Sequence, residues 1–146
     1  MTMNAELTSP KVTVGQVNRF IVEELRFANT MGLSCEDLAV DRGVVRFRFD
    51  EQWTRPGGVV AGPVLMALAD LAVYIAVFTR LGIVPMAVTS ELKTNFLRPA
   101  VGDDLVATAN LLKLGRRLAY ASVDVVEDRD RDRLVAHATS TYVVPD

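Results

Sequence analysis

One carboxylate stands out in this chain because of the residues around it. Asp70 is the only acidic residue between Arg55 and Arg80, and most of its neighbours there are alanine, leucine, valine and other apolar types. An ionised carboxylate in apolar surroundings costs several kcal/mol unless it is paired or hydrogen-bonded, and aspartate is a poor residue for a helix interior. Asp70 is therefore a candidate for acid–base or nucleophilic chemistry. The alternative is a structural carboxylate satisfied by backbone groups or by Tyr74 one turn further on.

The sequence around Asp70 predicts a long buried helix. Glycines and prolines mark a turn over residues 55–63, and Pro63 suits the first helical position, where a missing N–H does no harm. Alanine, leucine and methionine then favour a helix over residues 62–81 that is apolar on nearly all sides. Such a segment is also long enough to span a membrane, but Asp70 and the alternating segments that follow argue against a transmembrane helix.

The rest of the chain predicts one amphipathic helix and several strands. Thr13 can cap a helix over about residues 13–31, where apolar residues recur at three- and four-residue spacing. Strands over residues 33–40 and 44–49 form a hairpin around a turn with Asp41 and Gly43. Alternating apolar and polar residues predict an antiparallel meander of four more strands, over residues 86–97, 104–112, 118–127 and 134–144.

These elements predict a single α+β domain over residues 1–146. A long antiparallel sheet would wrap around the central apolar helix, with an extra helix at the N-terminal side. One sheet cannot cover a helix that is apolar on all sides. We therefore expect a second copy of the chain to cover the rest, in a homodimer or in a dimer of dimers, that is, a homotetramer.

Composition argues against several classes of protein. The formal net charge is −2, the isoelectric point is near 5.4, and no basic face stands out, so we expect no nucleic acid partner. Cys35 is the only cysteine and His137 the only histidine, which argues against an intrachain disulfide and against a metal site. Cys35 has no neighbour that would activate it as a nucleophile. The first ten residues lack the features of a signal peptide, which predicts a cytoplasmic protein.

The order and spacing of several motifs resemble the hotdog-fold acyl-CoA thioesterases of the PaaI-like, phenylacetate-degradation type. Residues 62–70 read Gly-Pro-Val-Leu-Met-Ala-Leu-Ala-Asp, similar to the family's helix that ends in Leu-Ala-Asp. Residues 89–99 carry Thr89 and close in Phe96-Leu97-Arg98-Pro99, similar to the family's aromatic-x-x-Pro. Gly115-Arg116 and the last strand resemble the family's Gly-Arg turn and final strand. The resemblance covers nearly the whole chain past the first helix.

The loop before the central helix departs from the family pattern. Where the family has His-Gly-Gly, this chain has Ala61-Gly62-Pro63, and where better-studied members often have an asparagine six residues before the histidine, it has Arg55. The contribution of the histidine is therefore absent or replaced. Arg55 is a candidate replacement, because a cation near the thioester is chemically reasonable, and a plain loop cation is the alternative.

The resemblance implies a mechanism for thioester hydrolysis. Asp70 would act as general base or nucleophile, the N–H of Gly62 at the helix N-terminus would polarise the carbonyl, and Thr89 would hold the attacking water. For Thr89 the alternative is an ordinary strand threonine. Gly62 and Asp70 lie about 12 Å apart along one helix, too far to act on the same carbonyl within one chain. The spacing therefore agrees with the family's arrangement, in which the site forms across a dimer interface.

The resemblance also implies a coenzyme A thioester as substrate, without a separate cofactor. A medium-chain or aromatic acyl group would suit a tunnel lined by Met66, Tyr74, Phe78 and Phe96. Arginines suit the phosphates of coenzyme A because guanidinium groups match phosphate geometry. The substrate-binding candidates beyond the tunnel are Arg55, Ala61, Pro63, Arg98, Arg116 and Arg117.

Two other functions remain open on the same fold. The first is an acyl-CoA-binding protein, a sensor or scaffold that lost catalysis together with the histidine. The second is a hydratase or dehydratase, for which related proteins use a histidine beside a carboxylate. Because the loop here has no histidine, the second is the weaker alternative.

Overall fold

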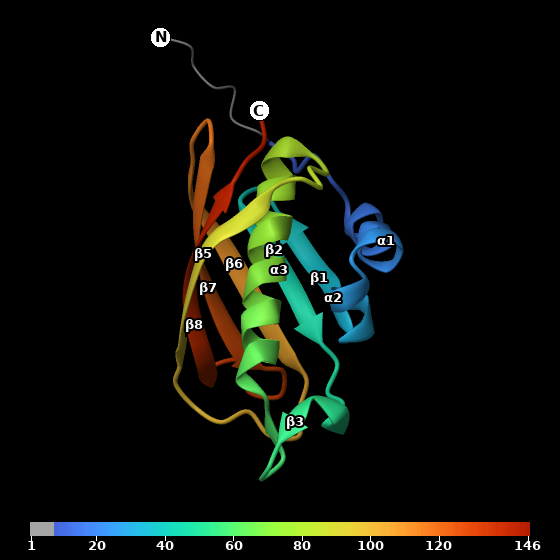
Figure 1. Cartoon of the computed structure of the whole chain (residues 1–146), viewed down its shortest axis with the longest axis vertical. Helices are drawn as coiled ribbons and strands as arrows, with labels where there is room; N and C mark the ends of the chain where they lie inside the picture. The colour runs from blue at the N-terminus through green and yellow to red at the C-terminus, as the bar shows by residue number, and fades with distance from the viewer. Residues whose placement is uncertain (1–7) are drawn as a thin grey trace.

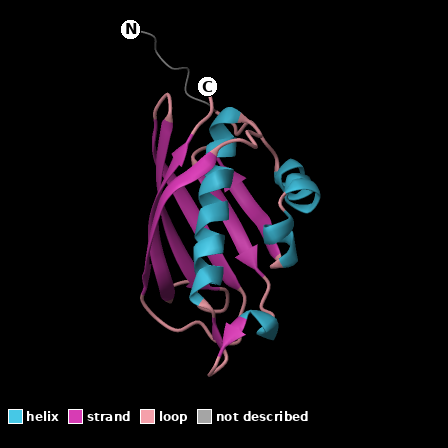
Figure 2. Ribbon diagram, in the orientation of Figure 1, coloured by secondary structure: helices cyan, strands magenta, loops and turns pink. Residues whose placement is uncertain are grey.

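The computed structural model describes residues 8–146 and confirms the predicted α+β class (Figures 1 and 2). One six-stranded antiparallel sheet curves around the long helix α3, and two short helices lie beside it. In chain order the elements are α1 (Val14–Glu24), α2 (Arg26–Thr30), β1 (Leu33–Ala39), β2 (Arg42–Phe47), a 3₁₀ turn (Glu51–Trp53), β3 (Thr54–Arg55), β4 (Val59–Val60), α3 (Gly62–Leu81), β5 (Val88–Phe96), β6 (Leu105–Leu114), β7 (Leu118–Glu127) and β8 (Leu134–Val143).

The strand order corrects one feature of the predicted meander. The sheet runs β1-β2-β6-β7-β8-β5, so β6, β7 and β8 pair in succession as predicted, but β5 pairs with β8. Tight turns join β6 to β7 and β7 to β8, whereas the longer loop after Phe96 carries the chain across the sheet to β6. As a result β5 forms an edge of the sheet, and most of its residues are exposed.

The helix α3 spans the predicted residues and forms the core of the protein. Thirteen of its residues are buried, and it contacts all of the strands in the large sheet. By length and composition α3 could cross a membrane, but 72% of its most apolar stretch is buried inside the protein. Small residues on the concave face of the sheet let α3 approach closely, namely Gly43, Ala107, Ala109, Ala119, Ala121, Ala136 and Ala138.

The N-terminal helix differs from the prediction because it is two helices. Thr13 caps α1 as expected and forms a capping box with Gln16. At Leu25 the backbone leaves the helical region, with φ −108° and ψ 69°, and α2 starts again at Arg26. Neither glycine nor proline marks this break in the sequence. After the break α2 lies beside β1, and residues of the break border a cavity.

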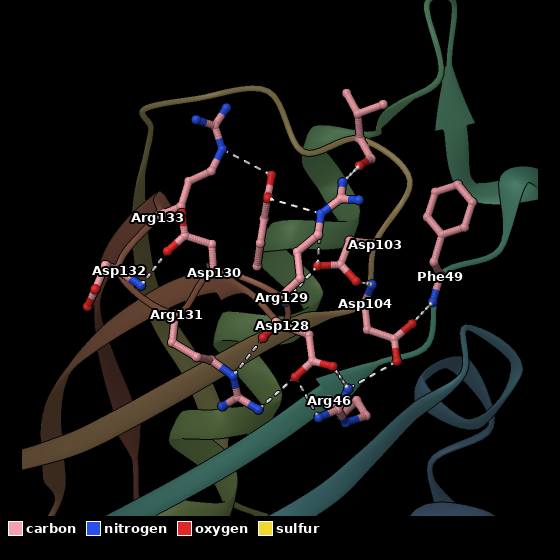
Figure 3. Close-up of polar contacts among 12 residues, drawn as sticks. Arg46, Phe49, Asp103, Asp104, Asp128, Arg129, Asp130, Arg131, Asp132 and Arg133 are labelled. Carbon is pink, nitrogen blue, oxygen red and sulfur yellow. Dashed lines mark hydrogen bonds and ion pairs between the residues drawn. The ribbon is translucent and has the colours of Figure 1, made fainter.

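A network of charges joins the sheet to the loop between β5 and β6 (Figure 3). Arg46 on β2 donates to Asp104 at 3.0 Å and to Asp128 at 2.9 Å. It also donates to Glu36 on β1 at 2.6 Å. The hydrogen bond from Arg46, with a second from Arg131, lowers the pKa of Asp128 to about 2. The network therefore fixes the start of β6 against β2 and against the turn between β7 and β8.

The charged turn between β7 and β8 also holds the loop that precedes β6. The backbone N–H of Arg129 donates to Asp103 at 2.9 Å, and its guanidinium donates to the carbonyl of Val101 at 2.9 Å. In the same loop the carbonyl of Ala100 accepts a hydrogen bond from the N–H of Val60, just before α3. The charged residues of this turn therefore position the loop before β6 beside the start of α3.

Replacing Gly43 tests the close packing of α3 on the sheet. A Cβ at this position would lie 2.5 Å from the carbonyl oxygen of Ala72 and 2.9 Å from the nitrogen of Ala76, both backbone atoms of α3. Gly43→Ala should therefore lower the free energy of unfolding by about 1–3 kcal/mol, as measured by urea denaturation. Gly15→Ala is the matched control, because its Cβ would meet nothing closer than 3.9 Å. Equal stability of the two variants would contradict the packing argument.

Candidate functional site

The carboxylate of Asp70 is held by two hydroxyl groups from the sheet. The hydroxyl of Thr89 donates to Asp70 Oδ1 at 2.5 Å, and the hydroxyl of Tyr142 lies 2.9 Å from the same oxygen and 3.0 Å from the Asp70 carbonyl oxygen. Within residues 8–146, Asp70 Oδ2 has no hydrogen-bond donor. One oxygen of the carboxylate is therefore fixed in place, and the other is left open.

The sheet register explains how these residues meet. Thr89 on β5 and Tyr142 on β8 are directly paired, so both side chains stand on the face of the sheet that α3 covers. A bulge just after Thr89 interrupts the pairing before Glu91. Asp70 lies in the middle of α3 and is only half-buried, because the start of β5 leaves that side of the helix uncovered.

The open side of Asp70 faces a cavity of about 530 Å³. This cavity, here named the Asp70 cavity, lies between α3, the break between α1 and α2, and the start of β5. Its wall is mainly apolar, but Glu24 and Arg26 also contribute to it. A volume in this range and an apolar wall with few polar groups are typical of small-molecule sites. The apolar residues of the wall include Leu25, Phe27, Ala67, Leu71, Ala87 and Val88.

Tyr142 is the residue of this site that the sequence analysis did not single out. In the sequence Tyr142 is one of the alternating residues of the last strand, and nothing in that pattern connects it to Asp70. Tyr74, the expected partner one turn along α3, instead donates to the carbonyl of Pro85 at 2.7 Å. Burial, and then the charge of Asp70, raise the pKa of Tyr142 above its ordinary value. Tyr142 therefore remains a proton donor to the carboxylate at physiological pH.

Tyr74 lies in the wall of the Asp70 cavity as predicted. Burial raises the pKa of its phenol to about 12, with further contributions from the charges of Glu24 and Asp70. Two carboxylates, those of Glu24 and Asp70, thus border one cavity together with the phenols of Tyr74 and Tyr142. Phe78 does not line this cavity, which corrects the predicted tunnel. It is fully buried, because its ring packs against Phe20 and Tyr74.

The start of α3 forms a second, separate cavity of about 350 Å³, here named the Gly62 cavity. Gly62, Arg55, Arg98 and Phe96 all contribute to its wall. No acceptor within residues 8–146 bonds the N–H of Gly62, so this donor is available at the positive end of the helix dipole. Arg55 is exposed and has no partner in the described residues, whereas Arg98 donates to the carbonyl of Leu134 at 2.7 Å.

One chain does not bring Gly62 and Asp70 together. They stand eight residues apart on a straight helix, about 12 Å along its axis, and they line different cavities. The predicted separation of the two functional groups within a single chain therefore agrees with the structure.

The remaining candidates are spread over the surface. Ala61 is half-buried, and its N–H donates to Trp53, whereas Pro63 is exposed and has no N–H to offer. Met66 is 36% exposed and lies outside the Asp70 and Gly62 cavities. Arg116 and Arg117 line a third depression, on the convex side of the sheet.

The single cysteine and the single histidine lie away from Asp70. Burial, and then the charge of Asp37, raise the pKa of the Cys35 thiol to about 12, so this thiol is not an activated nucleophile. The ring of His137 lies 2.7 Å from Asp124 on the convex face of the sheet. Neither residue contributes to the Asp70 cavity.

Comparison with known proteins places this site in a family context. The family model described as "Thioesterase superfamily" matches residues 57–140, which include Gly62, Asp70 and Thr89. A protein of Saccharolobus solfataricus that is provisionally named an esterase is 34% identical over 92% of this chain and 87% of its own length. Mouse acyl-coenzyme A thioesterase 13 is 28% identical over 70% of this chain and 73% of its own length.

The fold is also similar to that of a solved structure. A variant of the phenylacetic acid degradation protein PaaI from Thermus thermophilus superposes with a TM-score of 0.70 at 31% identity. The match covers 82% of this chain and 98% of that one.

Replacing Tyr142 with phenylalanine tests its part in holding the carboxylate. Tyr142→Phe removes a buried donor from Asp70 and should lower the free energy of unfolding by about 1–2 kcal/mol in urea denaturation. Tyr120→Phe is the matched control, since the Tyr120 hydroxyl has no hydrogen bond within residues 8–146 and the side chain is 40% exposed. The assignment would be wrong if both variants unfolded at the same urea concentration.

Proposed function

The chain belongs to the thioesterase superfamily, and on this premise we propose that it hydrolyses an acyl-CoA thioester to the free acid and coenzyme A. The observation that carries the proposal is the carboxylate of Asp70, which has one oxygen fixed by Thr89 and Tyr142 and the other open to an apolar cavity. Hydrolysis needs such a group, because a water must lose a proton as it attacks the thioester carbonyl.

We write the chemical step with Asp70 as a general base. Thr89 uses its proton to bond Asp70 Oδ1, so the lone pairs of its hydroxyl can accept a hydrogen bond from a water beside Oδ2. As Oδ2 takes a proton from this water, the water oxygen attacks the carbonyl carbon of the thioester. The tetrahedral intermediate then expels the sulfur as coenzyme A thiolate. Direct attack by Oδ2 as a nucleophile would use the same open oxygen.

The carbonyl oxygen also needs a donor as negative charge develops on it. The N–H of Gly62 is the candidate because it is unbonded within the described residues and lies at the N-terminus of α3. Arg55 lies in the same cavity and is exposed. We propose that its charge acts on the carbonyl in place of the family's histidine, for which this chain has Ala61.

The separation of Gly62 and Asp70 calls for a second subunit. We propose a homodimer in which the partner subunit's Gly62 meets Asp70, so that each site takes residues from both chains. The free edge of β5 supports this arrangement, since an exposed strand edge can pair with the same strand of another copy. Exposed apolar side chains lie along this edge and beside it, namely Met66, Met86, Val88, Phe96 and Leu97.

The acyl group is proposed to enter the Asp70 cavity. Its apolar wall and its volume of about 530 Å³ fit a medium-chain or aromatic acyl group better than a very long chain. The relatives support this class of substrate, because the mouse protein is named for acyl-coenzyme A and the Thermus protein for phenylacetic acid degradation.

Asp70→Asn tests the role of the carboxylate. The substitution keeps the shape of the side chain but removes the base, so kcat for thiol release from medium-chain and aromatic acyl-CoA esters should fall by at least ~100-fold, about 2.7 kcal/mol. Asp124→Asn is the matched control, because it removes a carboxylate from the convex face. Unchanged turnover in Asp70→Asn would exclude Asp70 as the base.

If the wild type showed no turnover but gained thermal stability from the same esters, an acyl-CoA-binding protein would be the better description.

A mixed dimer tests whether the site spans two subunits. Gly62→Pro removes the proposed donor, and the extended backbone of Ala61 (φ −62°, ψ 139°) is compatible with a following proline. Neither Gly62→Pro nor Asp70→Asn alone should turn over substrate at the normal rate. Co-expressed with two different tags and purified as the mixed dimer, they should recover about half of the wild-type activity, since one of the two shared sites is intact. A mixed dimer as inactive as its parents would place both groups of each site in one chain. Gly62→Ala, which keeps the N–H, is the control.

A further inference from the structure

The large sheet has two edge strands, and they differ in what covers them. One edge is β5 and the other is β1. The helices α1 and α2 lie alongside β1, whereas the outer edge of β5 has no neighbouring strand within residues 8–146 (Figure 1). A strand edge carries unpaired N–H and C=O groups, to which a strand of another chain can add. The two edges therefore offer different surfaces to a second copy of the chain.

Asn18, in the middle of α1, bonds the backbone of β1. Its side-chain oxygen accepts a hydrogen bond from the N–H of Cys35 at 2.8 Å, and its side-chain nitrogen donates to the carbonyl of Cys35 at 3.0 Å. A residue of a neighbouring antiparallel strand would exchange the same two bonds with Cys35. The amide of one helical side chain thus takes the place that the backbone of a further strand would occupy.

The position of Asn18 in a helix is explained by this contact. Asparagine is a poor residue for a helix interior, because its amide competes for backbone groups. In α1 the amide bonds the backbone of another element instead. Val17 and Ile21 on the same helix are buried, whereas Asn18 is half-buried. The apolar residues hold α1 against the core, and Asn18 fixes it along the edge of β1.

Other features of β1 protect its edge only weakly. Edge strands are often blocked by proline or by lysine, and β1 contains neither. The carboxylate of Glu36 is paired with Arg46 at 2.6 Å, and that of Asp37 is paired with Arg42 at 2.6 Å. A bulge after Cys35 makes the edge irregular. Because its carboxylates are paired, this edge has little charge with which to repel a second copy.

We propose that α1 guards the edge of β1 against pairing with the β1 strand of a second copy of this chain, and that Asn18 closes the guard. An edge that bonds a side-chain amide through both groups of Cys35 can bond a backbone amide in the same way. With α1 displaced, a two-fold axis beside Cys35 would let two copies exchange these bonds. The proposal concerns assembly and does not require turnover, and Asn18 does not line the Asp70 cavity.

A second open edge would turn a closed assembly into an open-ended one. In a dimer that pairs through β5, each copy uses one edge of its sheet, and its β1 edge lies at the far side. If the β1 edges also paired, every added copy would leave another free edge, and the sheet would grow without limit. This consequence rests on the proposed dimer, whereas the guard itself does not.

Asn18→Leu tests the guard. Leucine is the better helix former, but it covers the two groups of Cys35 without bonding them, which favours the displacement of α1. In hydrogen exchange followed by NMR, the Cys35 amide should exchange at least ~10-fold faster than in the wild type. In light scattering after gel filtration, the mass of Asn18→Leu should rise steadily with protein concentration, whereas the mass of the wild type should level off.

Two further variants make the test specific to the edge. Thr13→Ala removes the N-cap of α1 but leaves Asn18 in place, so its mass should equal that of the wild type. Asn18→Leu combined with Asp37→Lys places an exposed lysine on β1 beside Arg42. This double variant should return to a finite mass, because two edges of like charge repel each other.

The outcomes separate the guard from the proposed dimer. If the mass of Asn18→Leu stays at the wild-type value, the guard is wrong, whether or not the Cys35 amide exchanges faster. Growth that Asp37→Lys leaves unchanged would also overturn it, since the growth would then not pass through β1. A monomeric wild type, with an Asn18→Leu variant that stops at a dimer, would support the guard and refute only the β5 interface.

Discussion

The structure depends on the close contact between α3 and the concave face of the sheet. The helix is apolar on nearly all sides, so it gains stability wherever it is covered, and small residues on the strands let its backbone approach them. At Gly43 the two backbones are so close that even a methyl group would not fit. This contact fixes the position of the helix, and with it the positions of Gly62 at one end and Asp70 in the middle.

Asp70 is tolerated in this helix because it lies where the sheet ends. Thr89 and Tyr142, a directly paired couple on β5 and β8, supply hydroxyl groups to one carboxylate oxygen. The break between α1 and α2 leaves a cavity over the other oxygen. The protein therefore satisfies one oxygen of the carboxylate with hydrogen bonds and leaves the other open to the cavity, where the proposed general-base step would use it.

The edge strand β5 connects the proposed dimer interface with the Asp70 cavity. Its free edge and the apolar residues beside it support a dimer that brings the partner subunit's Gly62 to Asp70. Its first residue, Val88, also lines the Asp70 cavity. In the proposed complex one strand would thus border both the acyl group and the second subunit.

The sequence alone determined the elements and the main candidate of the site. The apolar run over residues 62–81 predicted α3 at its observed bounds. Turn residues and alternating patterns predicted the strands of the large sheet to within a few residues, and Asp70 stood out as a lone carboxylate among apolar residues. These features are local, and a pattern of a few residues is enough to specify them. The resemblance to the PaaI-like family added Thr89, which the structure places against Asp70.

Tertiary structure decided what depends on contacts between distant segments. The pairing of β5 with β8, the Tyr142 hydroxyl on Asp70 and the burial of Phe78 all join residues far apart in the chain, so no local pattern contains them. The break at Leu25 has no glycine or proline to announce it, and only the fold shows that it borders a cavity. Similarly, Arg98 and Arg116 are equivalent turn arginines in the sequence. In the fold Arg116 lines a depression together with Tyr120, whereas Arg98 lines the Gly62 cavity, and only the pairing of distant strands determines which segments lie on the same side of the sheet.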